Sequence, residues 1–155
     1  MAETVAFLVQ RGIAVMGHIG LQPQSVHGAG GYHVTGRKEA EQKKLLADAK
    51  ALTGAGAFSI VLECMDADLA AAVTAAVPVP TIGIGAGVAC DGQILVCDDL
   101  LGLSPGPLPR FVKPYAKVSE SVDKAFAQYA AEVRGRQFPS EEYSYQDKKK
   151  LRAVD

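Results

Sequence analysis

Three short apolar runs, each followed by glycine or a polar residue, constrain the fold of this chain more than any other feature. They are Ile13–Met16, Phe58–Leu62 and Thr81–Ile84. Uncharged runs of this length are typical of strands buried on both faces of a sheet. The segments between them have helical patterns, so helix and buried strand alternate along the chain. This alternation predicts an α/β fold with parallel strands joined by right-handed crossovers.

The helices are predicted from hydrophobic spacing and from residues that begin or end helices. Aspartate is a favourable N-cap residue, so Asp66 is expected to begin one of them. Gly12 and Gly135 follow the first and last helical patterns and are expected to end them. Four segments are predicted to be helical: Ala2–Arg11, Lys38–Leu52, Asp66–Val77 and Ser119–Arg134.

The remaining segments have weaker patterns. Gln93–Val96 fits either a strand or a helical turn, and Arg110–Tyr115 fits a fourth strand. The stretch Leu101–Pro109 is rich in Gly and Pro and predicts a loop. Residues 146–155 are polar, and we expect a disordered tail there.

Composition excludes several classes of function. The net charge is −1, which indicates neither a nucleic-acid partner nor a membrane partner. The N-terminus lacks the form of a signal peptide, and no apolar run reaches the roughly 18 residues of a membrane span. Three cysteines, Cys64, Cys90 and Cys97, form no CxxC pair, which favours reduced thiols and a cytoplasmic location.

The first strong candidate for a functional residue is His18. It lies in AVMGHIGLQPQS (residues 14–25), where an apolar run gives way to a polar loop predicted over Gly17–Gly36. We expect His18 where the first strand ends, at the sheet edge where α/β proteins bind ligands. A histidine satisfied by a backbone group is the alternative, although Gly17 and Gly20 leave room for close approach. The spacing of His18, His27 and His33 does not indicate a metal site.

The second candidate is Glu63, which directly follows the run Phe58–Leu62 and precedes Cys64 and Met65. Such a position is poor in water, and desolvation would make a carboxylate more basic, as a general base requires. The alternative is a structural carboxylate held by the dipole of the helix that follows.

A glycine run, Gly83–Gly87, follows the third apolar run. Its GxGxG spacing differs from the dinucleotide fingerprint GxGxxG. It could cradle an anion, or it could allow tight packing of strand and helix. Asp91, Asp98 and Asp99 have no evident partner in the sequence.

Several of these stretches occur together in a specific order. GHIGLQPQS, GGYHVTGR and VLEC precede PTIGIGAG and CDGQILV, and RFVKPYA and FPSEEYSY follow. Each motif alone is weak, but the ordered set is specific. It resembles the second half of the ketopantoate hydroxymethyltransferase family over roughly residues 3 to 145. His33 and Ala29 depart from the residues common in that family, which suggests drift in the loop.

The resemblance implies a (β/α)8 TIM barrel, of which this chain would hold about the last four βα units within residues 1–145. It implies transfer of a hydroxymethyl group from 5,10-methylenetetrahydrofolate to 3-methyl-2-oxobutanoate, a step in pantothenate biosynthesis and thus toward coenzyme A. Mg²⁺ would polarise the keto acid. Glu63 matches the family's proton acceptor, and His18 matches a histidine of the substrate pocket. The family's metal ligands belong to the first half of the barrel, so this chain should hold none.

Three hypotheses therefore remain. The chain is a portion of the transferase, or it is a non-catalytic half-barrel kept as an assembly module, or it is a different barrel enzyme acting on 2-oxo acids. An incomplete barrel leaves sheet edges open, so we expect a homo-oligomer or pairing with an N-terminal half.

Overall fold

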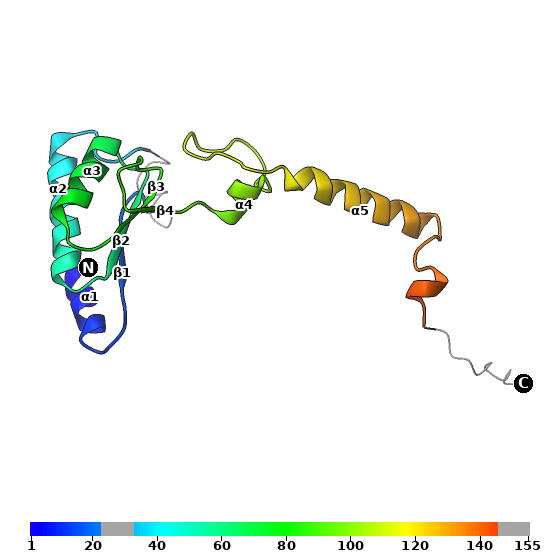
Figure 1. Cartoon of the computed structure of the whole chain (residues 1–155), viewed down its shortest axis with the longest axis horizontal. Helices are drawn as coiled ribbons and strands as arrows, with labels where there is room; N and C mark the ends of the chain where they lie inside the picture. Colours follow the sequence, from blue (N-terminus) through cyan, green and yellow to red (C-terminus); the bar gives the residue numbers. More distant parts are fainter. Residues whose placement is uncertain (23–32, 146–155) are drawn as a thin grey trace, which may run out of the picture. The chain divides into compact units, whose positions relative to one another are not determined.

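A computed structural model describes residues 1–22 and 33–145 of the chain (Figure 1). Ten elements are described: α1 (Ala2–Val9), β1 (Met16–Gly20), α2 (Glu39–Gly54), β2 (Ser59–Glu63), α3 (Ala67–Ala76), β3 (Thr81–Ile84), β4 (Gly92–Gln93), α4 (Cys97–Leu101), α5 (Val118–Arg134) and a 3₁₀ helix at Glu141–Tyr143. Residues 97–107 and 113–145 belong to a second unit; the other described residues form the first.

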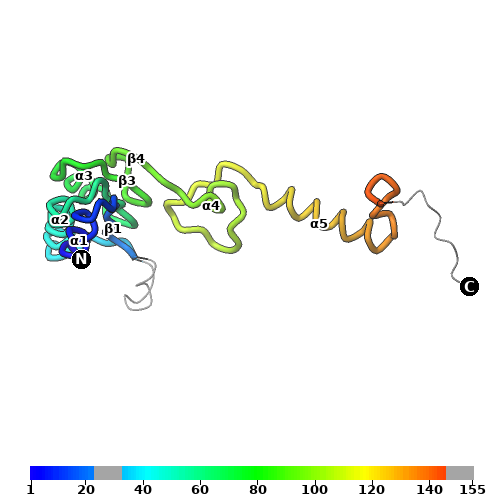
Figure 2. Tube along the Cα trace, turned by 90° about the horizontal axis from the view of Figure 1, so that it is seen from below, coloured from blue at the N-terminus to red at the C-terminus, as the bar shows by residue number. Residues whose placement is uncertain are grey.

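The first unit is built on a parallel sheet in the order β1-β2-β3-β4. The helices α1, α2 and α3 gather on one side of this sheet in both views (Figures 1 and 2). Parallel strands, each joined to the next through a helix or loop on that side, confirm the predicted α/β class. Among the described strands, β1 and β4 are the two edges.

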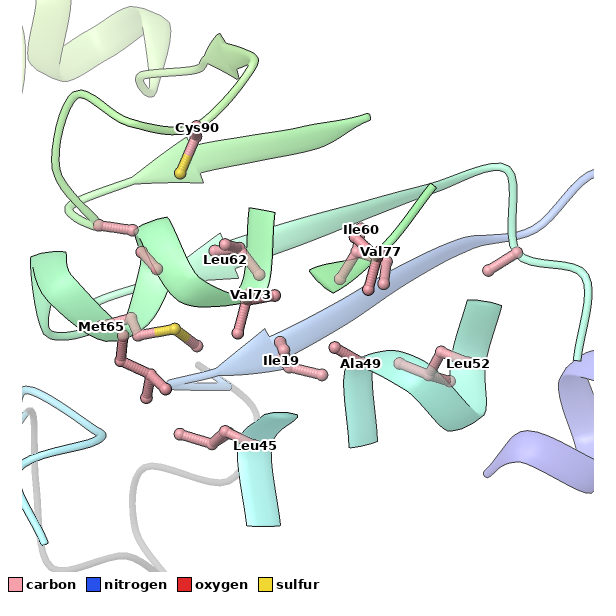
Figure 3. Packing of buried hydrophobic residues seen from close by; sticks show 14 of the residues in the cluster. Ile19, Leu45, Ala49, Leu52, Ile60, Leu62, Met65, Val73, Val77 and Cys90 are labelled. Carbon is pink, nitrogen blue, oxygen red and sulfur yellow. The ribbon is translucent and has the colours of Figure 1, made fainter. Parts of the chain in front are cut away.

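The core lies between the sheet and these helices. Ile60 and Leu62 of β2 are fully buried, and so is Val73 of α3. Figure 3 shows Leu45, Ala49 and Leu52 of α2 arranged along Ile19 of β1. Leu46, predicted on the same helix face, is half-buried and packs against this core. Burial of these side chains therefore holds α2 and α3 against the strands.

The predicted start of α3 is confirmed by its capping residue. Asp66 is the N-cap of α3, and its carboxylate accepts hydrogen bonds from the backbone N–H groups of Asp68 and Leu69. These bonds satisfy two amides that the first turn would otherwise leave without a partner.

The predicted bounds of two strands are wrong. The first strand begins at Met16 and not at Ile13, whose side chain is exposed, and it continues to Gly20. The second begins at Ser59, because Phe58 is exposed, and it includes Glu63. Strand bounds follow the register, in which Met16 lies beside Ser59 and Gly20 beside Glu63. The hydrophobic pattern alone does not contain that register.

Two weaker predictions are also settled. Gln93 is the last residue of the two-residue strand β4, while the stretch from Ile94 to Val96 is neither strand nor helix. The strand predicted over Arg110–Tyr115 is wrong, because this stretch forms turns and no ladder. It packs through Phe111 against Gly85 instead, as described below.

The second unit is mainly helical. Its α5 is one uninterrupted helix, which Gly135 ends as expected (Figure 2). Val122, Phe126, Tyr129 and Val133 are exposed side chains on it, in the amphipathic spacing that predicts the helix. No helix among the described residues is long and apolar enough to span a membrane. Pro23, Gln24, Ser25, His27, Ala29 and the predicted tail at 146–155 lie outside the described residues.

Candidate functional site

The two faces of the parallel sheet differ in what covers them. Ile19, Ile60 and Leu62 point toward the helices and are buried. Residues that alternate with them, including His18 and Glu63, are only half-buried. The open face therefore carries the candidate polar groups, beside the half-buried apolar residues Val61, Ile82 and Ile84.

His18 and Glu63 lie together on this open face. The His18 Nε2 atom is 3.0 Å from the Glu63 Oε2 atom, and the side chains are 33% and 14% exposed. His18 is the third residue of β1 and not at its end, as the sequence suggested, while Glu63 is the last residue of β2. The pair thus joins two neighbouring strands at the carboxyl-terminal side of the sheet.

The contact between the two side chains is electrostatic. The buried Nε2 atom has no partner with hydrogen-bond geometry among the described residues. The pair is therefore held by charge attraction, on the face of the sheet that the helices leave open.

Gly20 allows β1 to approach Glu63 closely. A Cβ atom on Gly20 would lie 2.2 Å from the carbonyl oxygen of Glu63, and the backbone of Gly20 has a φ of +94°. The next amide, that of Leu21, donates a hydrogen bond of 2.9 Å to the same carbonyl. Gly17 in turn packs against Leu52. The close approach that the sequence predicts at Gly17 and Gly20 is therefore made by other residues of this chain.

The residue after Glu63 has an unusual backbone. Cys64 has a φ of +47°, in the left-handed region that favours glycine. Burial raises the pKa of its thiol, and the charge of Glu63 raises it further. A thiol with a raised pKa stays protonated at neutral pH, so Cys64 is not suited to act as a nucleophile. All three cysteines are free.

The glycine run after β3 serves packing. A Cβ on Gly83 would lie 3.0 Å from the Cys90 thiol, and one on Gly85 would lie 2.7 Å from the ring of Phe111. A Cβ on Gly87 would lie 2.8 Å from that of Ala67. All three glycines are therefore closely packed by neighbours in the chain, and most tightly at Gly85 and Gly87, which favours the packing interpretation over an anion cradle.

Asp91 has a partner that the sequence did not reveal. Its Oδ2 atom accepts hydrogen bonds of 2.8 and 3.1 Å from the backbone N–H and the hydroxyl of Thr81. Asp99 accepts a hydrogen bond from Ser104. These carboxylates therefore hold local structure. An Asp–Gly pair just before a strand is the only signal that could have pointed to the role of Asp91.

No group of three or more potential metal ligands occurs within residues 1–22 and 33–145. Mg²⁺ prefers several oxygen ligands, often carboxylates and waters. The pair described above offers one carboxylate, and His18 contacts one of its oxygens. The described residues therefore do not fit a magnesium site.

Comparisons of the whole sequence with known proteins point to one family. A family model described as ketopantoate hydroxymethyltransferase matches residues 1–141. The 3-methyl-2-oxobutanoate hydroxymethyltransferase of Carboxydothermus hydrogenoformans is 57% identical over 145 residues, which cover 94% of this chain and 52% of that protein. The protein of the same name from Rhodospirillum centenum is 56% identical over 149 residues, or 96% of this chain and 54% of the relative.

The chain therefore spans about half the length of the curated relatives that it matches. Helix and parallel strand alternate in it as in part of a (β/α)8 barrel. With the match covering nearly the whole sequence, the chain belongs to the ketopantoate hydroxymethyltransferase family.

Proposed function

We propose that this chain supplies the proton-abstracting part of a hydroxymethyltransferase active site. The reaction would move a hydroxymethyl group from 5,10-methylenetetrahydrofolate to 3-methyl-2-oxobutanoate and give 2-dehydropantoate, in pantothenate biosynthesis. The observation that carries this proposal is the contact of 3.0 Å between His18 and Glu63 on the open face of the sheet.

Glu63 would act as the general base. The hydrogen on C3 of the keto acid is acidic because its removal gives an enolate conjugated with the neighbouring carbonyl. A carboxylate oxygen of Glu63 would take this proton, and C3 would then bond to the methylene carbon of 5,10-methylenetetrahydrofolate. The two bonds from that carbon to the folate nitrogens would break, water would supply the hydroxyl group, and tetrahydrofolate would leave. The Glu63 side chain is only 14% exposed, so little water competes for the carboxylate.

His18 would hold the Glu63 carboxylate and contact the substrate. Its Nε2 atom faces one carboxylate oxygen, which leaves the other oxygen of Glu63 for the C3 proton. The His18 side chain is 33% exposed, which leaves part of the ring open to a bound molecule. We therefore assign His18 to the substrate pocket.

Mg²⁺ enters this proposal only through the resemblance. When bound, it would polarise the 2-oxo group of the keto acid. The described residues do not fit such an ion, and we assign its ligands to the N-terminal half of the barrel. No step proposed for Glu63 or His18 depends on the position of the ion.

The partner that completes the site would be an N-terminal half-barrel or a second copy of this chain. A groove of about 590 Å³ follows the edge strand β1 between α1 and α2. Most of its lining is apolar and includes Val5, Leu8, Val15 and Met16, while His18, Lys44 and Asp48 also line it. An unpaired parallel edge beside an apolar groove favours addition of another strand. The three free cysteines support a reducing, cytoplasmic compartment.

A second candidate function is a non-catalytic half-barrel that serves assembly. The same open edge and groove favour it, because they suit a partner whether or not chemistry follows. The two candidates differ in whether Glu63 reacts with the keto acid.

The experiment uses this chain combined with the N-terminal half of the Carboxydothermus hydrogenoformans relative. Exchange of the C3 proton of 3-methyl-2-oxobutanoate with deuterium is followed by NMR. Glu63→Gln should abolish exchange and leave keto-acid binding nearly intact, while Glu39→Gln, an exposed carboxylate on α2, should change neither. Exchange retained in Glu63→Gln would exclude the assignment.

A further inference from the structure

We propose that Thr35 is a positioning residue, which holds the turn after β2 and thereby sets the place of Glu63. This inference rests on the proposed function, because that function is what makes the position of Glu63 important. The contacts that place Thr35 beside the turn do not depend on the proposed function. Thr35 lies just before α2 and far in sequence from β2. The residue is buried, with only 6% of its surface exposed.

The turn at Cys64 determines where the Glu63 side chain lies. In an uninterrupted strand, Met65 would point to the same open face as Glu63, because side chains alternate. Met65 is instead 2% exposed and belongs to the core on the helix side. The left-handed backbone of Cys64, with φ of +47°, makes this switch. Glu63 is therefore the last side chain of β2 on the open face.

Thr35 supplies most of the hydrogen bonds around this turn. Its backbone N–H and its hydroxyl both donate to the carbonyl of Cys64, at 2.8 and 3.2 Å. Its own carbonyl accepts from the backbone N–H of Asp66 at 2.9 Å. Thr35 and Met65 consequently form an isolated parallel bridge. The remaining bonds at the turn run from the Cys64 N–H to the carbonyl of Ile84, at 2.9 Å, and from the Met65 N–H to the carbonyl of Gly85, at 3.2 Å.

Thr35 is itself held by a fixed neighbour. Gly36 donates its backbone N–H to the carboxylate of Glu41 at 2.8 Å, and its carbonyl accepts from the Gln42 side chain at 2.9 Å. A Cβ on Gly36 would lie 2.3 Å from Leu69 Cδ2, so α3 closes the other side. Gly36 is thus anchored to α2 and α3, and this anchoring holds Thr35 in the place where it contacts Cys64.

A conformation that side chains rarely adopt persists only where its surroundings enforce it. Loss of the Thr35 hydroxyl removes one of the enforcing bonds at Cys64 and leaves the others. We therefore expect a small displacement of Glu63 and no loss of the fold. Proton abstraction depends steeply on such displacements, whereas substrate binding through other groups does not.

The first test uses the 155-residue chain itself and needs no activity. The ¹⁵N resonance of His18 Nε2 reports its contact with Glu63. Thr35→Val should move this resonance toward its position in Glu63→Gln, and Thr35→Ser should keep it near the wild-type position. Thr53→Val is the matched control, because it removes a hydroxyl that donates to the Ala49 carbonyl within α2.

A double variant tests whether the effect passes through Cys64. Glycine adopts a positive φ without strain, so Cys64→Gly removes the need to enforce the turn. In that background, Thr35→Val should move the His18 resonance less than it does in the wild type. An equal effect in both backgrounds would exclude the route through Cys64.

The second test uses the combined barrel. Thr35→Val should lower kcat for C3 proton exchange about tenfold with KM within about twofold, and Thr35→Ser should restore kcat. An unmoved His18 resonance in folded Thr35→Val, or unfolding of that variant alone, would overturn the inference. Exchange retained in Glu63→Gln would instead overturn the proposed function and leave the resonance result standing.

Discussion

The Asp91 Oδ2 atom lies 2.8 Å from the backbone nitrogen of Thr81, so a carboxylate before β4 holds the first residue of β3. The hydroxyl of Thr81 donates to the same oxygen and lies 2.8 Å from the hydroxyl of Thr74 on α3. These hydrogen bonds, led by the backbone N–H of Thr81, hold the pKa of the Asp91 carboxyl below its ordinary value. The edge strand is therefore tied to the sheet by an ionised group.

This contact should make stability depend on pH in a defined direction. A carboxyl whose pKa is lower in the folded state stabilises the fold above its unfolded pKa of about 4, and this contribution is lost as the pH falls through the folded pKa. Asp91→Asn should lower the urea midpoint at pH 7, and the difference from wild type should shrink below about pH 4. Asp123→Asn, an exposed position on α5, is the control and should show no such difference.

Two glycines with similar backbones should respond differently to alanine. Gly12 has a φ of +80° with nothing near the position of a Cβ, whereas Gly20 has a φ of +94° and the Glu63 carbonyl 2.2 Å away. Gly12→Ala should cost about 1–2 kcal/mol of unfolding free energy for its backbone conformation alone. Gly20→Ala should cost about 3 kcal/mol or more, because overpacking adds to that cost. Equal midpoint shifts in urea would contradict the close approach of β1 to Glu63.

The fold could be predicted where local chemistry decides it. The bounds of β3 match the predicted run Thr81–Ile84, and Asp66 begins α3 as its residue type suggests. The alternation of helix and strand was enough to give the α/β class. The predicted starts of β1 and β2 were wrong because the pairing of Met16 with Ser59 is a tertiary property, absent from either hydrophobic run.

The candidate site could be predicted only in part. His18 and Glu63 were found because both interrupt apolar segments, and the register then places them on neighbouring strands. Nothing local marks Thr35, whose partner Cys64 is 29 residues away. The strand predicted at Arg110–Tyr115 failed for a similar reason, since Phe111 packs against Gly85 and pairs with no strand.

His18 should matter less to the reaction than Glu63. In the combined barrel, His18→Ala removes the group that faces Glu63 Oε2 but leaves the carboxylate in place. We expect a smaller loss than in Glu63→Gln, expressed in KM for the keto acid as much as in kcat. Steady-state kinetics of proton exchange would measure both constants. If neither constant changes, His18 has only a structural role.

The isolated chain should associate and should lack turnover. The β1 edge is unpaired among the described strands, and the apolar groove beside it has a volume of about 590 Å³. Exposed strand edges and apolar grooves favour pairing with other chains. Sedimentation of the purified chain should therefore show a species larger than a monomer, or a complex when the N-terminal half of a relative is added. Met16→Lys, at an exposed residue of this edge, should weaken that association, whereas Phe7→Lys, an exposed residue of α1 that does not line the groove, should not. The chain alone should neither bind Mg²⁺ specifically nor transfer a hydroxymethyl group. A stable monomer with magnesium-dependent turnover would show that its own residues complete the site.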